Sequence, residues 1–276
     1  MASHDAILEA LGLAPTWRLR EQPGLAVDPL SRRAESFAAG EPVPKAAATA
    51  ATAGIAAPKR VAREEGADAP DARIIRIANL DWGGFAQDVD ACIACGLSQT
   101  RKKTVPGVGD IHAEWLFVGE APGAEEDARG EPFVGQGGKL LDNMLAALGL
   151  RRGENVYIAN VLKCRPPNNR APEPREVDAC RPYLNRQIEL LRPKVIVALG
   201  KSAATTLLDM EATIASLRGR VHRYAGVPLV VTYHPAYLLR NLPEKQKAWE
   251  DLLFARRTLR GGDNAAAGTA ASAEAP

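Results

Sequence analysis

Three residues that could take part in chemistry follow short apolar runs of this chain, at the point where each run ends. They are Glu120, Asn160 and His234. A carboxylate, an amide and an imidazole can hold a polar ligand and can accept, donate or balance charge during a reaction. Because ligands of open α/β folds bind where the carboxyl ends of strands meet the loops, we expect these three side chains to converge on one crevice.

The runs that position these residues have the length and composition of buried parallel strands, bounded by turn residues. They are Trp115–Val118, Val156–Ala159, Val195–Leu199 and Leu229–Tyr233. Amphipathic helical patterns alternate with them, over Leu140–Leu148, Pro174–Leu191, Lys201–Leu208 and Lys245–Leu259. This alternation predicts an α/β fold of three layers, α/β/α, around a central and mostly parallel four-stranded sheet.

Two glycine-containing segments lie near the first strand end. Gly119 and Gly123 flank Glu120, and glycine lets backbone N–H groups approach a ligand or a phosphate closely. The second segment, residues 132–138, is a Gly-rich turn that carries one aromatic residue, Phe133. This turn lies in the chain between the first and the second of the polar strand ends.

All four cysteines of the chain fall into two pairs. Cys92 and Cys95 form a C-x2-C pair, and Cys164 and Cys180 follow later in the chain. This pattern is typical of a four-thiolate metal or cluster site. Judged from the cysteines alone, a structural zinc ion fits nearly as well as an iron–sulfur cluster.

The bulk composition narrows the class of protein. The chain has 276 residues and a formal net charge of +2, which is too balanced to indicate nucleic-acid binding unless cations cluster locally. No apolar run is long enough to span a membrane, and the N-terminus does not resemble a signal peptide. We therefore expect a cytoplasmic, nucleoid-associated monomer, and a reducing setting in which cysteine pairs are ligands more often than disulfides.

Composition divides the chain into four parts. Residues 1–24 indicate a short docking motif, and residues 25–75 indicate a flexible linker rich in Ala and Pro. Residues 76–260 hold the strands, helices and cysteines, and form the predicted folded domain. Residues 261–276, rich in Ala and Gly, are predicted to be a disordered tail.

At this point the chain resembles a known family, the iron–sulfur or family 4 uracil-DNA glycosylases, over about residues 80–260. The resemblance depends on motifs in the right order: Gly119-Glu-Ala-Pro-Gly123, Gly130-Glu-Pro-Phe-Val-Gly135, Asn160 with Lys163-Cys-Arg-Pro-Pro167, His234-Pro-Ala-Tyr237 and the four cysteines. One such motif is weak evidence, whereas their joint occurrence is specific. The implied function is removal of uracil from DNA in base excision repair.

The resemblance also implies roles for single residues. Phe133 would stack on the uracil ring, and Asn160 would bind its Watson–Crick edge and reject cytosine. His234 would stabilise negative charge near uracil O2, and Glu120 would position or activate the attacking water. The resemblance further implies that the substrate is bound by Gly119, Ala121 and Gly123. These roles agree with the chemistry, because an extruded base must be held by stacking and edge hydrogen bonds while charge develops on base and sugar.

The resemblance further implies that Cys92, Cys95, Cys164 and Cys180 bind a [4Fe–4S] cluster with a structural role. A related branch traps uracil-DNA covalently through a histidine near the third cluster position. Residues 163–172 contain no histidine, so we expect turnover. No motif places a lysine for Schiff-base chemistry, which predicts a monofunctional enzyme that leaves an abasic site.

Other interpretations of the same residues remain open. Taken singly, Glu120 could be a solvated loop carboxylate, Phe133 a core residue, Asn160 a turn residue and His234 a cap at a strand end. A second class of function is a non-catalytic iron–sulfur DNA-binding protein associated with replication. A third, a zinc-stabilised hydrolase, is disfavoured because no carboxylate–histidine metal motif accompanies the cysteines.

Residues 1–24 lie outside the glycosylase resemblance. Their Leu8–Leu13 and Trp17–Arg20 segments resemble the N-terminal peptide of the psi subunit of the DNA polymerase III clamp loader, with one residue inserted before Trp17. That peptide docks on the chi subunit, so chi is a candidate partner beside uracil-containing DNA. The alternative is a short helix that packs on this protein's own domain.

Overall fold

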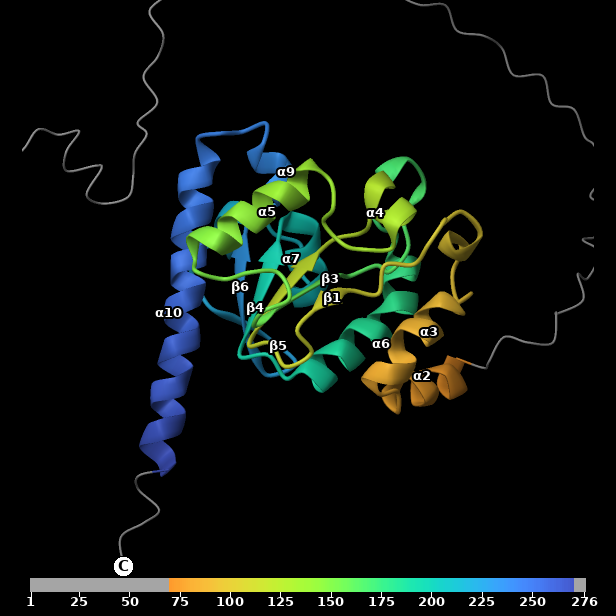
Figure 1. The fold of residues 1–276 in the computed structure, drawn as a ribbon, viewed down its shortest axis with the longest axis horizontal. Coiled ribbons are helices and arrows are strands. Elements are labelled where there is room, and N and C mark those ends of the chain that lie inside the picture. The colour runs from red at the N-terminus through yellow and green to blue at the C-terminus, as the bar shows by residue number, and fades with distance from the viewer. Residues whose placement is uncertain (1–69, 271–276) are drawn as a thin grey trace, which may run out of the picture. The chain divides into compact units, whose positions relative to one another are not determined.

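The structure is a computed structural model that describes residues 70–270, with side chains from Ala72 to Gly261 (Figure 1). The predicted docking motif at 1–24 and the predicted linker up to residue 69 lie outside the described residues. Residues 271–276 of the predicted tail lie outside them too. The strands, the helices and the four cysteines discussed below all belong to the described part of the chain.

A mixed, mostly parallel sheet forms the centre of the described domain, with strand order β1-β3-β2-β4-β6-β5. Its strands are β1 (Val108–Gly109), β2 (Trp115–Gly119), β3 (Val156–Asn160), β4 (Val195–Leu199), β5 (His222–Tyr224) and β6 (Val227–Thr232). The four strands predicted from apolar runs are β2, β3, β4 and β6, and they are mutually parallel. The predicted α/β fold class is confirmed.

The number of strands is larger than the four expected, because two antiparallel edge strands extend the sheet. Strand β1 is only two residues long and includes Gly109, whose φ is +143°. Strand β5 is three residues long and carries His222 and Arg223. Neither segment has an apolar run, because an edge strand pairs through its backbone and is not buried on both faces. The expectation of four strands is therefore corrected to six.

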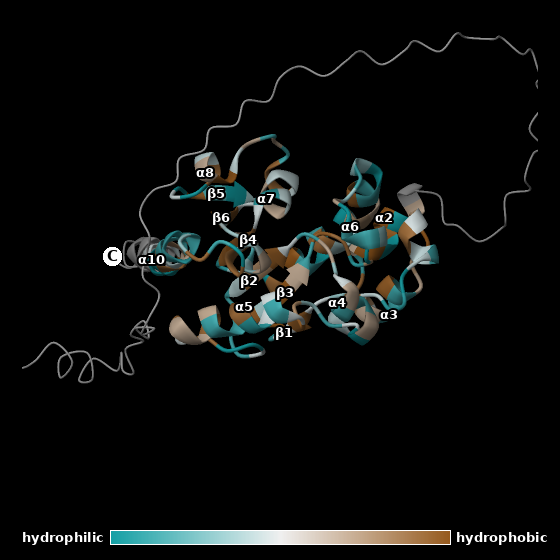
Figure 2. Ribbon diagram, turned by 90° about the horizontal axis from the view of Figure 1, so that it is seen from above, coloured by the Kyte–Doolittle hydropathy of each residue, from teal (hydrophilic) through white to brown (hydrophobic). Residues whose placement is uncertain are grey.

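Helices cover both faces of the sheet, as Figure 2 shows from above. Along β2, Trp115 and Phe117 join the apolar core on the side of α5 (Gln136–Ala147) and α10 (Glu244–Ala270). Leu116 and Val118 join the core on the opposite face, under α6 (Pro174–Leu191) and α7 (Lys201–Leu208). This alternation follows from the two-residue period of a strand and confirms the three layers.

The predicted helices are present, with some different ends. Helices α6 (Pro174–Leu191) and α7 (Lys201–Leu208) have the predicted bounds. Helix α5 begins earlier than expected and ends before Gly149, whose φ is +76°. The remaining helical elements are α2 (Pro70–Ala78), α3 (Trp82–Asp90), α4 (Ala124–Arg129), α8 (Ile214–Leu217), α9 (Pro235–Leu238) and the short 3-10 turns η1 (Gly96–Gln99) and η2 (Pro167–Asn169).

Two predicted segment boundaries differ from the structure. Helix α2 begins at Pro70, inside the segment predicted as linker, because Ile77 is buried against the domain and Arg73 donates to the carbonyl of Ala179 in α6. Helix α10 continues to Ala270, inside the predicted tail. Alanine has the highest helix propensity, and extending an existing helix avoids the cost of nucleation. Of the predicted tail, residues 261–270 are therefore helical.

None of the helices in the described part of the chain is long and apolar enough to cross a membrane.

Candidate active site

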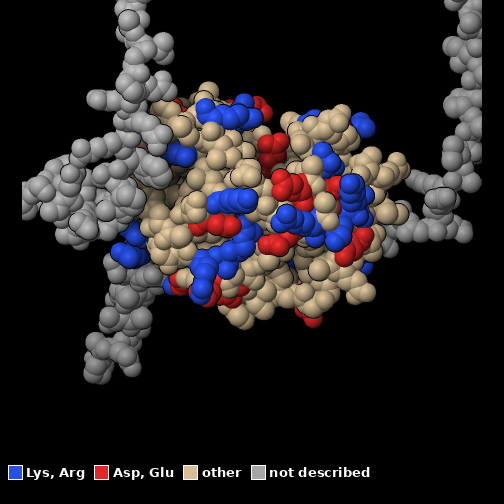
Figure 3. Space-filling model, turned by 45° about the horizontal axis from the view of Figure 1, so that its top comes forward, with Lys and Arg blue, Asp and Glu red and all other residues tan. Residues whose placement is uncertain are grey.

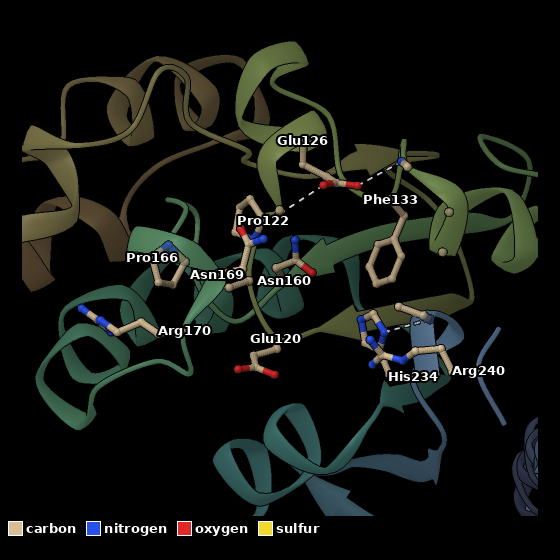
Figure 4. Close-up of a pocket in the computed structure, with 16 residues that line it drawn as sticks. Glu120, Pro122, Glu126, Phe133, Asn160, Pro166, Asn169, Arg170, His234 and Arg240 are labelled. Carbon is tan, nitrogen blue, oxygen red and sulfur yellow. Dashed lines mark hydrogen bonds between the residues drawn. The ribbon is translucent and has the colours of Figure 1, made fainter. Parts of the chain in front are cut away.

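A cavity of about 530 Å³ opens where β2, β3 and β6 end (Figure 4). Its lining comprises Glu120, Ala121, Pro122, Gly123, Glu126, Phe133, Gly135, Gly137, Gly138, Asn160, Pro166, Asn169, Arg170, His234, Ala236 and Arg240. The structure thus brings Glu120, Ala121, Gly123, Phe133, Asn160 and His234 together, as expected of strand ends in one sheet. Its volume suits a small ligand.

Gly119, the remaining predicted site residue, lies behind the cavity wall. It is the last residue of β2 and the register partner of Asn160 in β3. A Cβ atom at this position would lie 2.4 Å from Asn160 Oδ1 and 2.6 Å from Phe133 Cζ. Only glycine therefore allows the amide and the aromatic ring to stand this close to the strand.

The Asn160 side chain presents an unused acceptor to the cavity. The residue is 2% exposed, and Oδ1 has no hydrogen-bond partner among the described residues. The backbone carbonyl of Asn160 accepts a hydrogen bond of 2.8 Å from Nζ of Lys163, which is itself buried and also bonds Gln187. A buried polar atom without a partner costs free energy, so an acceptor in this position fits a ligand that donates.

Phe133 places its ring beside that acceptor with an unusual backbone. The residue is 7% exposed and has φ of +55°, in the left-handed region that disfavours non-glycine residues. Its ring is stacked on the imidazole of His234, with 5.5 Å between centroids and 27° between planes. Gly138 packs on its carbonyl, since a Cβ there would lie 1.7 Å from Phe133 O.

His234 is held as a neutral imidazole of defined tautomer. It caps α9, with Nδ1 accepting from the backbone N–H of Ala236 at 3.2 Å. In the neutral form the proton is therefore on Nε2. Burial lowers the pKa of His234 to about 4, opposed by the charge of Glu126 and assisted by that of Arg240. Nε2–H is available as a donor at neutral pH.

Two carboxylates face the cavity from different sides of Asn160 in Figure 4. Glu120 follows β2, and its backbone carbonyl accepts from the N–H of Leu162 at 3.1 Å. Glu126 lies in the first turn of α4. Its Oε2 accepts from Gly123 N at 3.1 Å, and its Oε1 accepts from Val134 N at 3.0 Å and Gly135 N at 3.2 Å. Glu126 thus joins two loops of the site.

Sequence reasoning did not single out Glu126. A signal existed, because Gly123 and Glu126 have the spacing of a capping box, in which the third helical residue bonds the N-cap backbone. The bonds to Val134 and Gly135 had no such signal, since they depend on how the two loops fold over each other.

One wall of the cavity comes from the segment between the two later cysteines. Pro166, Asn169 and Arg170 line it. Asn169 has φ of +54° and accepts from Nε of Arg165, and Arg170 forms a salt bridge with Glu176. The sequence carried no signal for this wall beyond the asparagine pair, a residue type that tolerates left-handed backbone.

The four cysteines are free thiols within electrostatic range of one another. N–H groups point at three of the sulfurs: Arg73 Nη2 to Cys92 Sγ at 3.6 Å, Arg101 Nη1 to Cys164 Sγ at 3.1 Å, and Lys163 N to Cys180 Sγ at 3.3 Å. Burial raises the pKa of the Cys180 thiol to about 12, although Lys163 opposes this. Donors around sulfur favour a bound anionic thiolate.

Among the described residues, no group of three or more His, Cys, Asp or Glu side chains is close enough to hold one metal ion. A tetrahedral zinc site needs four ligand atoms within about 2.3 Å of one centre. The four cysteines offer an all-sulfur donor set, which suits either a zinc ion or an iron–sulfur cluster.

The charged side chains are mixed in sign on the face shown in Figure 3, where Lys and Arg alternate with Asp and Glu. No uniformly basic surface covers this face. At the cavity itself, Arg240 is an exposed cation of the lining and is available to contact a phosphate.

The Uracil DNA glycosylase superfamily profile matches residues 106–253, which include β2–β6 and the whole cavity. The fold, the strand-end site and this match define the class: the chain belongs to the uracil-DNA glycosylase superfamily.

Several relatives carry one more specific description, type-4 uracil-DNA glycosylase. The relative from Archaeoglobus fulgidus is 50% identical over 174 residues, 60% of this chain and 86% of that protein. Those from Pyrobaculum aerophilum and Thermotoga maritima are each 47% identical. They cover 63% and 56% of this chain, and 92% and 82% of their own length. The chain is therefore similar to the type-4 branch over most of the length of those proteins.

Proposed function

We propose that this chain is a type-4 uracil-DNA glycosylase that hydrolyses the N-glycosidic bond of uracil in DNA and leaves an abasic site for base excision repair. The observation that carries the proposal is the buried, unpaired Oδ1 of Asn160 in a cavity walled by Phe133. Family membership supports the activity, and the geometry below supports the residue roles.

The base would be extruded from the DNA and held edge-on to Asn160. Uracil carries a donor at N3 and an acceptor at O4, which match Oδ1 and Nδ2 of Asn160. Cytosine has an acceptor at N3 and a donor at N4, so it would face like groups at both positions. A site built to hydrogen-bond its substrate rejects such an analogue strongly, because buried polar groups are left unpaired. Phe133 would stack on the ring.

Bond cleavage would build positive charge on the sugar and negative charge on the base. The C1′–N1 bond breaks with its electron pair on uracil, whose O2 would accept a hydrogen bond from Nε2–H of His234. Water supplies hydroxide to C1′, and Glu120 would orient the water and take or balance its proton. A donor fixed where negative charge develops lowers the barrier without reorganisation. A neutral imidazole in this role fits the lowered pKa of His234.

The reaction would end at the abasic site. Among the described residues, the cavity lining includes no lysine, so no amine is available for a Schiff base with the sugar. Nζ of Lys163 is buried and bonded to Asn160 O and Gln187 Oε1. The expected enzyme is monofunctional and does not cut the backbone.

Cys92, Cys95, Cys164 and Cys180 would hold a [4Fe–4S] cluster. The all-sulfur donor set, the N–H groups directed at its sulfurs and the similarity to type-4 enzymes support this. When bound, the cluster would cross-link residues 92–95 to residues 164–180, and the second of these segments carries the cavity wall with Pro166 and Asn169.

Two expectations about partners and segments remain predictions. Docking of residues 1–24 on the chi subunit lies outside the described residues and outside the matched region, and no comparison supports it. The division into a docking motif, a linker and a glycosylase domain rests on composition. The alternative function, a non-catalytic iron–sulfur DNA-binding protein, would keep the fold without the reaction.

The test is incubation of the purified, cluster-bearing protein with a uracil-containing oligonucleotide, followed by alkali to reveal abasic sites. Asn160→Asp and Asn143→Asp are assayed alongside, because Asn143 is an exposed asparagine of α5. Cleavage only after alkali is expected for wild type and Asn143→Asp. Asn160→Asp should lose uracil activity and gain activity on cytosine. A protein that binds DNA yet cleaves nothing would support the non-catalytic alternative.

A further inference from the structure

Phe133 has a backbone conformation that its own residue type does not favour. Its φ of +55° lies in the left-handed region, which is unfavourable for a residue with a Cβ atom. Such a conformation persists only where the surroundings hold it, and it occurs often at functional sites. The question is which groups hold the peptides on either side of Phe133.

The carbonyl side is held by Arg152, in the loop between α5 and β3. Its Nη1 donates to Pro132 O and its Nη2 donates to Phe133 O, each at 2.9 Å. The guanidinium is itself fixed by Asp142, with 3.0 Å from Nε and 2.9 Å from Nη2 to Oδ1. Two successive carbonyls therefore point at one planar cation whose own position is set by α5.

The N–H side is held by Glu126. Its Oε1 accepts from Val134 N and Gly135 N, the two peptide groups that follow Phe133. Its Oε2 accepts from Gly123 N, in the loop after β2. A carboxylate binds the donors and a guanidinium binds the acceptors of one turn, so the charge of each partner matches the backbone groups it meets.

We infer that Arg152 and Glu126 are positioning residues for the reaction: together they hold the turn at Phe133 so that its ring lies against the base. We call this pair of side chains the Phe133 clamp. The inference rests on the proposed role of Phe133 in stacking on uracil. Arg152 does not line the cavity, so its effect on the reaction passes through Phe133.

Lysine cannot replace the guanidinium in this clamp. Its single ammonium is a point charge, whereas the two bonds from Arg152 leave different nitrogens of a rigid plane. Arg152→Lys should therefore keep part of the stability that the positive charge contributes to the fold. It should not keep the turn at Phe133 in its present orientation.

The test is a double-mutant cycle with Arg152→Met and Phe133→Ala on the full chain with its cluster. Single-turnover cleavage of uracil-DNA at varied enzyme concentration gives the maximal rate and the half-saturating concentration, and thermal denaturation gives Tm. Arg151→Met is the matched control, because Arg151 is an exposed neighbour that pairs only with Glu154 among the contacts of the described side chains. Arg152→Lys is measured too, in case the methionine variant does not fold.

We expect Arg152→Met to lower the efficiency of cleavage roughly ten- to hundredfold, as small misplacements of positioned groups do. In the Phe133→Ala background the same change should have little further effect, because the ring it orients is gone. Tm should fall by a similar amount in both backgrounds. Arg151→Met should match the wild type, and Arg152→Lys should share the non-additive pattern.

Two results would overturn the inference. One is an equal loss of cleavage efficiency from the Arg152 change with and without the Phe133 ring. The other is a lowered Tm with unchanged cleavage, which would assign Arg152 to stability alone. A wild-type protein that cleaves no uracil-DNA would instead remove the proposed function, and the inference with it.

Discussion

Gly119 and Asn160 face each other across two neighbouring parallel strands, at a separation that leaves no room for a side chain on the first. A Cβ on Gly119 would lie 2.4 Å from the amide oxygen of Asn160. The side-chain amide of Asn160 presents an unpaired acceptor to the cavity. Its position therefore depends on residue 119 having no Cβ atom.

Gly119→Ala is expected to lower uracil cleavage by at least about a hundredfold, because Asn160 and Phe133 must both move away from the added methyl. Because the added methyl overpacks a buried position, Tm should fall as well. Single-turnover assays and thermal denaturation check this. Gly261→Ala is the control, since a Cβ there meets nothing within 4 Å. Unchanged cleavage by Gly119→Ala would show that Asn160 does not need its present position.

The acid limb of the activity should reflect His234. Because its pKa in the folded protein is about 4, the imidazole stays neutral through pH 6.5, where an ordinary histidine titrates. The cleavage rate should therefore show no inflection near 6.5 from this residue, and it should fall as pH approaches 4. NMR titration of the imidazole, assigned with His234→Asn, measures the pKa directly. His112→Asn, at an exposed loop position, is the control. A charged imidazole at neutral pH would contradict the proposed donor role.

The same residue makes stability depend on pH. Between pH 6.5 and 4 the unfolded chain binds a proton at this histidine and the folded chain does not, so the free energy of unfolding falls as pH is lowered through this window. His234's contribution is fully present above pH 6.5 and is lost by about pH 4. Denaturation curves give the free energy of unfolding of wild type and of His234→Asn at each pH. The wild-type value minus the variant value should decrease as pH is lowered from 6.5 to 4, and it should be constant above pH 6.5.

Loss of the proposed cluster should disturb the cavity wall that residues 164–180 form. Cys164→Ser removes a buried sulfur that Arg101 contacts, and it unties the segment that carries Pro166 and Asn169. We expect loss of visible absorbance and of bound iron, a lower Tm and weaker cleavage. Iron and sulfide should restore cleavage to wild-type protein from which a chelator has removed the iron, and should not restore it to Cys164→Ser. The restored wild type is the control for damage by the chelator itself. If iron-free protein cleaved uracil-DNA at the wild-type rate, the cavity wall would keep its structure without a cluster.

The buried ion pair between Arg218 and Asp251 should matter for stability and not for the reaction. The Nε–Oδ2 distance is 2.6 Å, and Arg218 also donates to Lys247 O. Asp251→Asn leaves a partly buried guanidinium without its charge partner, which should lower the free energy of unfolding by about 1–3 kcal/mol, below the full cost of breaking a deeply buried pair.

Chemical denaturation measures the change, and Glu250→Gln, at an exposed position, should be close to neutral. Equal stability of Asp251→Asn and the wild type would show that the pair contributes little. Cleavage by the folded fraction of Asp251→Asn should match the wild type, because neither residue of the pair lines the cavity.

The parts of the fold that the sequence predicts are those with local signals. Strands β2, β3, β4 and β6 are continuous apolar runs because they are buried on both faces, and α6 ends where Arg192, in a left-handed conformation, and Pro193 stop the helix. The predicted cavity residues come together for a topological reason, since strand ends of a parallel sheet share one edge. These are consequences of periodicity, and periodicity is visible in the chain.

The parts that the sequence does not predict depend on contacts between distant backbone groups. Arg152 looks like any loop arginine until it meets the carbonyls of Pro132 and Phe133. Strand β1 pairs through two residues, and no side-chain pattern can mark so short a pairing. Glu126 lies in a run of acidic residues; its capping-box spacing indicates the bond to Gly123, but nothing local indicates its bonds to Val134 and Gly135.

The cavity draws its walls from residues as early as Glu120 and as late as Arg240. Strand β6, which leads to His234, is inserted between β4 and the edge strand β5 late in the chain. During synthesis the growing polypeptide therefore carries Asn160 and Phe133 long before the histidine wall exists. A nascent chain cannot hold an extruded base in this cavity, and competence to act on DNA begins only once the last part of the domain has left the ribosome.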